Sequence, residues 1–140
     1  MNLFTLSAYE TTAEHFFETL KKQRADLVLD VRLRNTNQLC GFTKEKDLAY
    51  FVHTITGAEY VHDLRFAPAS ELLDLYTKHA IDWNGYRSGY LEEMEARNAR
   101  SIFNDSYGRY ASICILGTAT THRRSHSEAL LDYLERNTKA

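Results

Sequence analysis

The chain has 140 residues, 44% of them hydrophobic, which is the size of one domain that buries roughly 70% of the surface its unfolded form exposes. Its 17 basic and 19 acidic side chains give a formal net charge of −2, so it lacks the global positive field that drives sequence-independent binding to duplex DNA. The start has no signal-peptide pattern, no apolar run approaches the roughly 20 residues of a membrane helix, and only two cysteines occur. We therefore expect a cytoplasmic protein with reduced thiols and no membrane partner, folded as a single domain over residues 1–140.

The first half of the chain alternates between strand-like and helix-like spacing of apolar residues. Apolar positions at i, i+3, i+4 and i+7 predict one helix that begins near Ala13 and another that begins near Thr43 and ends at Gly57. Short apolar runs before and after these helices predict strands. The three predicted strands are residues 3–6, 27–31 and 59–64, and the continuous run 27–31 is typical of a strand covered on both faces.

The second half continues the alternation. Pro68 marks the start of a helix, a turn is expected at residues 85–89 with a helical face after it, a strand at 110–116, and a last helix at 125–137. Alternating strands and helices favour right-handed βαβ crossovers. The predicted fold class is α/β, a single-domain parallel or mainly parallel sheet of about four strands flanked by helices on both faces, with 27–31 and 113–116 adjacent or next-adjacent.

Ligands of such sheets bind outside the carboxyl ends of the strands, and two strands here end in polar residues. The first is the strand 27–31, where Asp30 and Arg32 share one face and Val31 lies on the other. A buried aspartate is costly unless it is paired, although side chains two apart on a strand are rather far for an ideal bidentate pair. Asp30 is therefore either a proton-transfer group or a structural residue held by Arg32.

The second strand end leads into a turn at residues 118–124, just before the last predicted helix. Gly117 permits close backbone approach, Thr118 and Thr121 offer hydroxyls, the helix start supplies free N–H groups, and Arg123 supplies charge. Together these features favour a phosphate or a carboxylate. The alternative is a solvated basic helix start in which Thr121 is the cap.

From the residues alone, we expect Arg32, Arg123 and the backbone of 118–121 to hold an anion, with Asp30 or His122 as the proton-transfer group. The expected partner is a phosphate-bearing small molecule, a nucleotide or a nucleic-acid end, on which the protein acts by general acid–base chemistry without a cofactor. The alternative is a non-catalytic ligand-binding or interaction module that keeps the pocket for recognition.

Three other patterns are weaker. His122 and His126 stand four apart and can share a helix face, but without a third ligand no metal site is predicted. Cys40 with His62 or His122 is a second candidate, a nucleophilic Cys/His pair. Cys114 lies inside an apolar strand and is predicted to be a small buried hydrophobic residue.

Aromatic residues also gather around the turn predicted at 85–89. Trp83, Tyr86, Arg87 and Tyr90 mix rings with a cation, as a nucleotide or single-strand pocket does, and core packing is the alternative.

The order of these landmarks along nearly the whole chain resembles the domain-of-unknown-function 488 family. Its members commonly carry an Asp-Val-Arg strand end, a Tyr-x-His strand and a Cys-x-Glu strand end that leads to Cys-His-Arg. The matching landmarks are Asp30-Val31-Arg32, Phe42, residues 59–64, Tyr90, Met94, Cys114 and His122-Arg123. The resemblance implies that the family's pocket is lined by Asp30, Arg32, Tyr60, His62, His122 and Arg123.

The chain departs from the family's pattern at three places. Leu116 stands where the family has glutamate, Thr121 where it has cysteine, and Ser7-Ala8-Tyr9 near the position of a Gly-His-Ser strand end. The chain thus resembles a divergent member, which implies an altered or inactive site if the family's site is catalytic.

Overall fold

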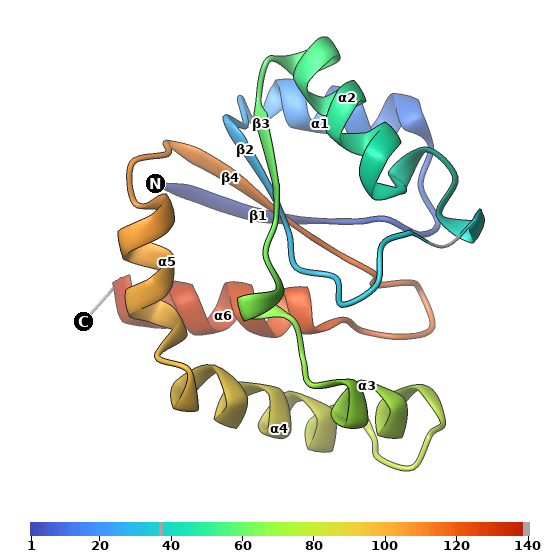
Figure 1. Cartoon of the computed structure of the whole chain (residues 1–140), viewed down its shortest axis with the longest axis vertical. Helices are drawn as coiled ribbons and strands as arrows, with labels where there is room; N and C mark the ends of the chain where they lie inside the picture. Colours follow the sequence, from blue (N-terminus) through green and yellow to red (C-terminus); the bar gives the residue numbers. More distant parts are fainter. Residues whose placement is uncertain (37, 139–140) are drawn as a thin grey trace.

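Four parallel strands form the centre of the protein, in the spatial order β1-β4-β2-β3 (Figure 1). Their bounds are β1 Asn2–Ser7, β2 Leu27–Asp30, β3 Glu59–His62 and β4 Ser112–Gly117. The structure is a computed structural model that describes residues 1–36 and 38–138, without the side chains of residues 38–40, 137 and 138. The predicted parallel sheet is confirmed, and β2 and β4 are direct neighbours with Leu29 opposite Ile115.

Six helices surround the sheet in the described part of the chain. Their bounds are α1 Ala13–Lys22, α2 Glu45–Thr56, α3 Ser70–Thr77, α4 Trp83–Ala96, α5 Ala99–Tyr107 and α6 His126–Thr138. Thr12 caps α1 by accepting a hydrogen bond from the His15 N–H, and Gly57 ends α2 in the left-handed region at φ 75°. None of the described helices combines the length and the apolar character needed to cross a membrane.

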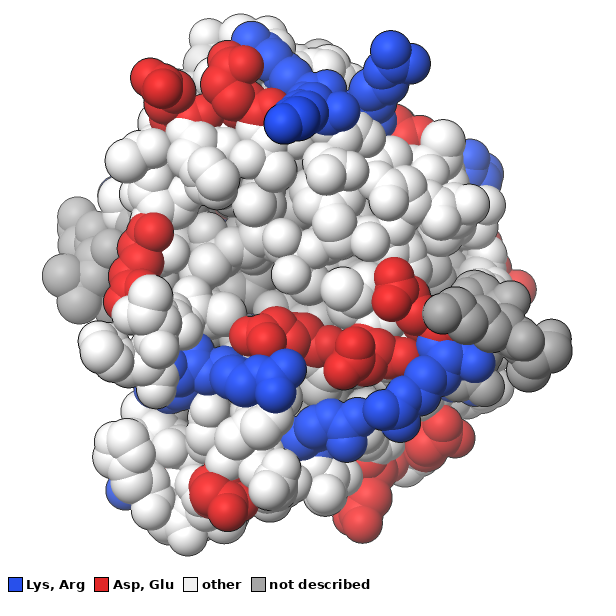
Figure 2. All heavy atoms as spheres, turned by 180° about the vertical axis from the view of Figure 1, so that it is seen from behind, with Lys and Arg blue, Asp and Glu red and all other residues white. Residues whose placement is uncertain are grey.

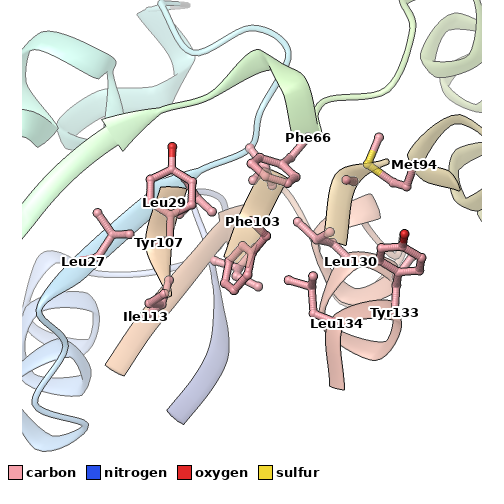
Figure 3. Close-up of a cluster of buried hydrophobic side chains, with 14 of the residues drawn as sticks. Leu27, Leu29, Phe66, Met94, Phe103, Tyr107, Ile113, Leu130, Tyr133 and Leu134 are labelled. Atoms are coloured by element: carbon pink, nitrogen blue, oxygen red, sulfur yellow. The ribbon is translucent and has the colours of Figure 1, made fainter. Parts of the chain in front are cut away.

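The period of two along each buried strand divides the apolar core into two clusters. Ile113 and Ile115 of β4 face α4, α5 and α6 (Figure 3), whereas Cys114 and Leu116 face α1 and α2. All four side chains are fully buried. Helices therefore cover both faces of the sheet, as the continuous apolar runs of the strands predict.

The turn predicted at residues 85–89 is wrong, because these residues lie inside α4. Asp82 caps the helix by accepting a hydrogen bond from the Gly85 N–H at 2.9 Å. A Cβ atom at Gly89 would lie 2.9 Å from Leu72 Cδ1, so this glycine serves the close packing of α3 on α4. The sequence pattern also missed α5, which follows α4 after Asn98 at φ 57°.

The connections place the candidate site at one edge of the sheet. The chain passes from β1 and β2 to helices on one face, and from β3 and β4 to helices on the other (Figure 1). Because β4 lies between β1 and β2, the chain departs in opposite directions from neighbouring strands at their carboxyl ends. This is the topological switch point at which open α/β sheets bind ligands.

Candidate functional site

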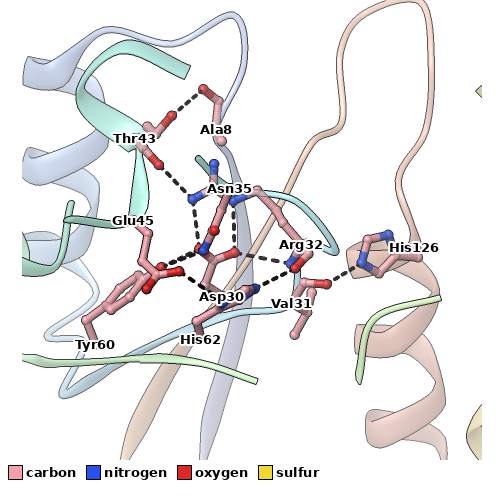
Figure 4. Close-up of polar contacts among 10 residues, drawn as sticks. All are labelled: Ala8, Asp30, Val31, Arg32, Asn35, Thr43, Glu45, Tyr60, His62 and His126. Atoms are coloured by element: carbon pink, nitrogen blue, oxygen red, sulfur yellow. Dashed lines mark hydrogen bonds and ion pairs between the residues drawn. The ribbon is translucent and has the colours of Figure 1, made fainter. Parts of the chain in front are cut away.

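Asp30 at the end of β2 is the centre of a buried polar network (Figure 4). Arg32 donates from Nε to Asp30 Oδ1 at 2.9 Å and from Nη2 to Asp30 Oδ2 at 2.7 Å. Oδ2 also accepts hydrogen bonds from the Tyr60 hydroxyl at 2.5 Å and from Asn35 Nδ2 at 3.1 Å. Arg32 Nη2 further donates to the Thr43 carbonyl at 2.7 Å, so both charged groups are held from several sides.

The bidentate pair corrects the expectation that Asp30 and Arg32 are too far apart. β2 ends at Asp30, and the Arg32 N–H donates to Asp30 Oδ1 at 3.2 Å, which turns the chain and brings the guanidinium back. The same arrangement follows β3, where Arg65 donates to Asp63 from N at 3.0 Å, Nε at 2.9 Å and Nη2 at 2.7 Å. There the Tyr107 hydroxyl is the added donor, at 2.6 Å from Asp63 Oδ2.

Asp30 is built to stay ionised. Burial raises its pKa, but the hydrogen bonds and positive charge of Arg32, with those from Tyr60 and Asn35, outweigh burial and hold the pKa below 3.8. Burial and the Asp30 charge raise the pKa of the Tyr60 hydroxyl well above its ordinary value. A carboxylate with donors on both oxygens and a lowered pKa is a poor proton acceptor, so these contacts favour the structural interpretation of Asp30.

His62 joins this network from β3. Its Nε2 lies 2.7 Å from the Arg32 carbonyl oxygen, and its Nδ1 lies 3.2 Å from Glu45 Oε2 at the start of α2. The structure thus brings together Asp30, Arg32, Tyr60 and His62, as the family resemblance implies. Asn35, Thr43 and Glu45 contribute further contacts to this group.

Several backbone donors of the turn at 118–124 are already engaged in hydrogen bonds. Thr120 Oγ1 accepts hydrogen bonds from the N–H groups of His122 at 3.2 Å and Arg123 at 3.1 Å. The Thr121 N–H donates to Glu10 Oε2 at 2.9 Å. His122 itself is exposed.

The expectation of free N–H groups at the start of α6 is also wrong. Ser125 precedes the helix, its N–H donates to Glu128 Oε1 at 3.3 Å, and its Oγ accepts from the Ser127 N–H at 3.4 Å. Ser125 Oγ also accepts from the Thr118 N–H at 3.2 Å. A Cβ atom at Gly117 would lie 2.1 Å from Ser127 Oγ, so this glycine allows β4 to approach the helix rather than a ligand.

A cavity of about 300 Å³ nevertheless opens at this edge of the sheet. The segments that follow β1, β2 and β4 line this cavity, together with α3 and the first residue of α6. No aspartate or glutamate lines it, and we call it the arginine cavity after three of its lining residues. Its polar and charged lining includes Arg32, Arg34, Arg123, Thr118, Thr77 and His126.

The three arginines differ in how far their charge is compensated. Arg32 is paired with Asp30, and Arg34 Nη2 lies 3.9 Å from Asp74 Oδ1, with both of those side chains about half exposed. Arg123 forms no ion pair among the described residues, and its guanidinium lies 5.9 Å from the centre of the Tyr76 ring. Arg123 therefore supplies the uncompensated positive charge of the arginine cavity.

His126 is a site residue whose position the sequence did not reveal. Its Nε2 donates to the Val31 carbonyl at 2.7 Å, which leaves Nδ1 as the acceptor of the Tyr86 hydroxyl at 3.3 Å. Burial lowers its pKa to about 4, so the ring is neutral at pH 7. His122 lies before α6, so the shared helix face is wrong, and the described residues contain no group of three or more possible metal ligands.

A second cavity, of about 280 Å³, lies beside the first at the ends of β1 and β4. Tyr9 lines both cavities. We call the second the Glu10 cavity, because Glu10 is the one acidic residue among those that line it. Its other polar lining residues are Ser7, Thr11, His15, Thr120 and Thr121.

Those remaining sequence candidates whose side chains the structure describes line neither cavity. Cys40 lies outside the described side chains, and burial raises the pKa of the Cys114 thiol, which is fully buried. Tyr86 stacks on Tyr76 with ring centres 4.2 Å apart, and the Arg124 guanidinium lies 4.6 Å above the Trp83 ring. The aromatic cluster is therefore part of the packing of α3, α4 and the turn, which favours the core alternative.

The sheet topology defines a small α/β protein with two cavities at the carboxyl ends of its strands. A protein-family model, described as Domain of unknown function DUF488, matches residues 12–134, and the chain therefore belongs to this family. Comparison with curated proteins and with solved structures gave no match.

Proposed function

We propose that the protein binds a small molecule that carries a phosphate or a carboxylate group, and that the anion lies in the arginine cavity. The observation that carries this proposal is a cavity at the switch point with three arginines and no carboxylate in its lining. Arg123 provides the charge, and the Thr118 hydroxyl provides an uncharged donor, whereas the Thr77 hydroxyl already donates to the Leu73 carbonyl at 2.9 Å. A cavity of about 300 Å³ is of the size that takes a small ligand.

The geometry favours recognition over acid–base chemistry by Asp30 or His122. Asp30 is fully buried with both carboxylate oxygens engaged, and it lines neither cavity. His122 is exposed and also lines neither. Because no contact links the two side chains, we propose a ligand-binding module in which the Asp30 network shapes the wall of the cavity.

Titration calorimetry with inorganic phosphate and with phosphorylated small molecules tests the proposal. Each charge-assisted hydrogen bond is worth about 1.5–3 kcal/mol, so Arg123→Ala is expected to weaken binding roughly ten- to a hundredfold. Arg124→Ala is the matched control, because the Arg124 guanidinium is held by Glu128 at 3.0 Å and lies over Trp83. Failure of the parent protein to bind any such anion, or equal losses in both variants, contradicts the proposal.

A further inference from the structure

We propose that the ligand is a sugar phosphate, with its phosphate in the arginine cavity and its hydroxyl groups in the Glu10 cavity. This inference rests on the proposed function and adds the chemistry of the ligand's uncharged part. It depends on the geometry of Glu10, on the polar groups around it, and on the position of Tyr9 between the two cavities.

Glu10 is held in an unusual backbone conformation. It is one of four non-glycine residues with positive φ in the described chain, and its φ is 53°. The other three, Arg24, His79 and Asn98, follow α1, α3 and α4, where left-handed residues commonly end helices. Glu10 instead follows β1, so helix termination does not account for its conformation.

The conformation directs the Glu10 carboxylate to the turn after β4. Glu10 Oε2 accepts the hydrogen bond from the Thr121 N–H across 111 residues of sequence. Ser7 fixes the same two segments together, because its hydroxyl donates to the Ala119 carbonyl at 2.5 Å and accepts from the Tyr9 N–H at 3.0 Å. The exposed carboxylate is therefore directed to the turn after β4 by a hydrogen bond, which positions it for a ligand at this edge of the sheet.

The free groups of the Glu10 cavity suit hydroxyl donors. Glu10 Oε1 has no hydrogen-bond partner among the described residues, and neither has the His15 ring. An ionised carboxylate only accepts hydrogen bonds, and threonine hydroxyls both donate and accept. This set matches neighbouring hydroxyl groups of a sugar, in the way that an acidic residue accepts from ribose hydroxyls at other switch points.

The two cavities together orient such a ligand. Glu10 repels a phosphate from its own cavity, whereas Arg123 attracts it to the other. Tyr9 lines both, so the connecting carbon atoms of the sugar lie against Tyr9 while the two ends reach their cavities. Ribose 5-phosphate has this chemistry, and it occurs both as a free sugar phosphate and as part of a nucleotide.

The test compares the calorimetric affinities of inorganic phosphate, ribose 5-phosphate and adenosine 5′-monophosphate. We expect ribose 5-phosphate to bind at least about tenfold more tightly than inorganic phosphate, because the sugar adds hydrogen bonds. Glu10→Gln is expected to remove that advantage without weakening inorganic phosphate, since the amide oxygen still accepts from Thr121. Glu14→Gln makes the same change of charge at an exposed position of α1. This variant is expected to keep the tighter binding of ribose 5-phosphate over inorganic phosphate.

The possible results separate the two proposals. Equal affinity for phosphate and ribose 5-phosphate, or an advantage that survives Glu10→Gln, overturns the sugar-phosphate inference and leaves the anion site intact. Absence of binding by either compound contradicts the proposed function itself. Among supporting results, tight binding of the nucleotide identifies nucleotides as the source of the ligand, and its exclusion identifies a free sugar phosphate.

Discussion

At the scale of single residues, one arrangement occurs twice in the chain. An aspartate at or just after a strand end accepts hydrogen bonds from the backbone and the side chain of the arginine two residues later. In Asp30–Arg32 both side chains are at most 1% exposed, whereas the Arg65 side chain of Asp63–Arg65 is 51% exposed. A tyrosine hydroxyl completes each pair, from Tyr60 and from Tyr107. The two arrangements therefore have the same set of interacting groups but differ in how far these groups are buried.

Removing the tyrosine hydroxyls is expected to affect the two copies unequally. A hydrogen bond to a charged group is worth about 1.5–3 kcal/mol, and the cost of losing it is highest where water cannot replace the donor. Asp30 is fully buried, whereas Asp63 is 7% exposed and its Arg65 partner is half exposed. Tyr60→Phe should therefore lower the free energy of unfolding by about 2–3 kcal/mol and Tyr107→Phe by less. Urea unfolding of both variants measures this, and a larger loss in Tyr107→Phe contradicts the ranking.

His126 is expected to make the protein less stable in weak acid. Its folded pKa of about 4 lies below its ordinary value of 6.5, so the unfolded state binds more protons between these pH values. The stability that the neutral His126 ring contributes is fully present above pH 6.5. As the pH falls toward 4, the free energy of unfolding decreases by up to about 3 kcal/mol.

Unfolding free energies measured across this pH range test that expectation. In His126→Gln, an amide N–H can still donate to the Val31 carbonyl, and the dependence on pH in this window should be reduced. His122→Gln removes an exposed imidazole and should behave as the parent protein does. An unchanged pH dependence in His126→Gln shows that another group is responsible.

At the scale of elements, the approach of α6 to the end of β4 decides where the turn at 118–124 lies. Gly117 is the contact point, because a Cβ atom there would overlap both Ser127 and Ser125 Oγ, the latter at 2.7 Å. The apolar pattern predicts β4 and α6 but not this close approach. No periodic pattern in the sequence predicts a contact between a strand end and the side chains that cap a helix.

Gly117→Ala is expected to destabilise the protein by about 1–3 kcal/mol and to weaken anion binding, because α6 and the turn with Arg123 must move together. Gly85→Ala is the control, since a Cβ atom there meets Asp82 Oδ1 and Ile81 Cβ at 3.4 Å and alanine favours the helix. Thermal unfolding and phosphate titration of both variants provide the measurement. A Gly117→Ala protein as stable as the parent contradicts this role.

The same contrast explains which parts of the site could be predicted. Asp30 and Arg32 follow an apolar strand, and this position alone predicts a polar cluster at the sheet edge. The groups that complete the cluster are the Asn35 amide, which donates to Asp30, and the Thr43 carbonyl, which accepts from Arg32, and both come from a segment without periodic spacing. Glu10 also follows a strand, but its bond to Thr121 depends on the neighbouring position of β1 and β4, which only the sheet order reveals.

At the scale of the whole molecule, positive and negative charges are intermixed. The face in Figure 2 shows basic side chains beside acidic ones. Arg124 and Glu128 form one of the ion pairs of the described residues. With a formal net charge of −2, the molecule has no overall positive field for a nucleic-acid backbone. The anion binding that we propose therefore relies on the local charge of the arginine cavity.

We therefore expect no binding of duplex DNA at physiological salt, because such binding requires several phosphates to be neutralised at once. Fluorescence anisotropy with a labelled DNA duplex over a series of salt concentrations measures this. Arg123→Ala should weaken the small anion and leave the DNA result unchanged. Tight duplex binding with a steep dependence on salt shows that a cationic surface has been overlooked.

The position of β4 has a consequence for how the chain folds during synthesis. Of the four described strands β4 is synthesised last, yet it is the strand that joins β1 to β2, which do not pair with each other. In a nascent chain that lacks residues 112–117, β2–β3 is therefore the one native strand pair that can form. β1 has no native partner strand until β4 has been synthesised. The pairing of β1 with β4 spans about a hundred residues, which makes the closing step of the sheet a slow, long-range event.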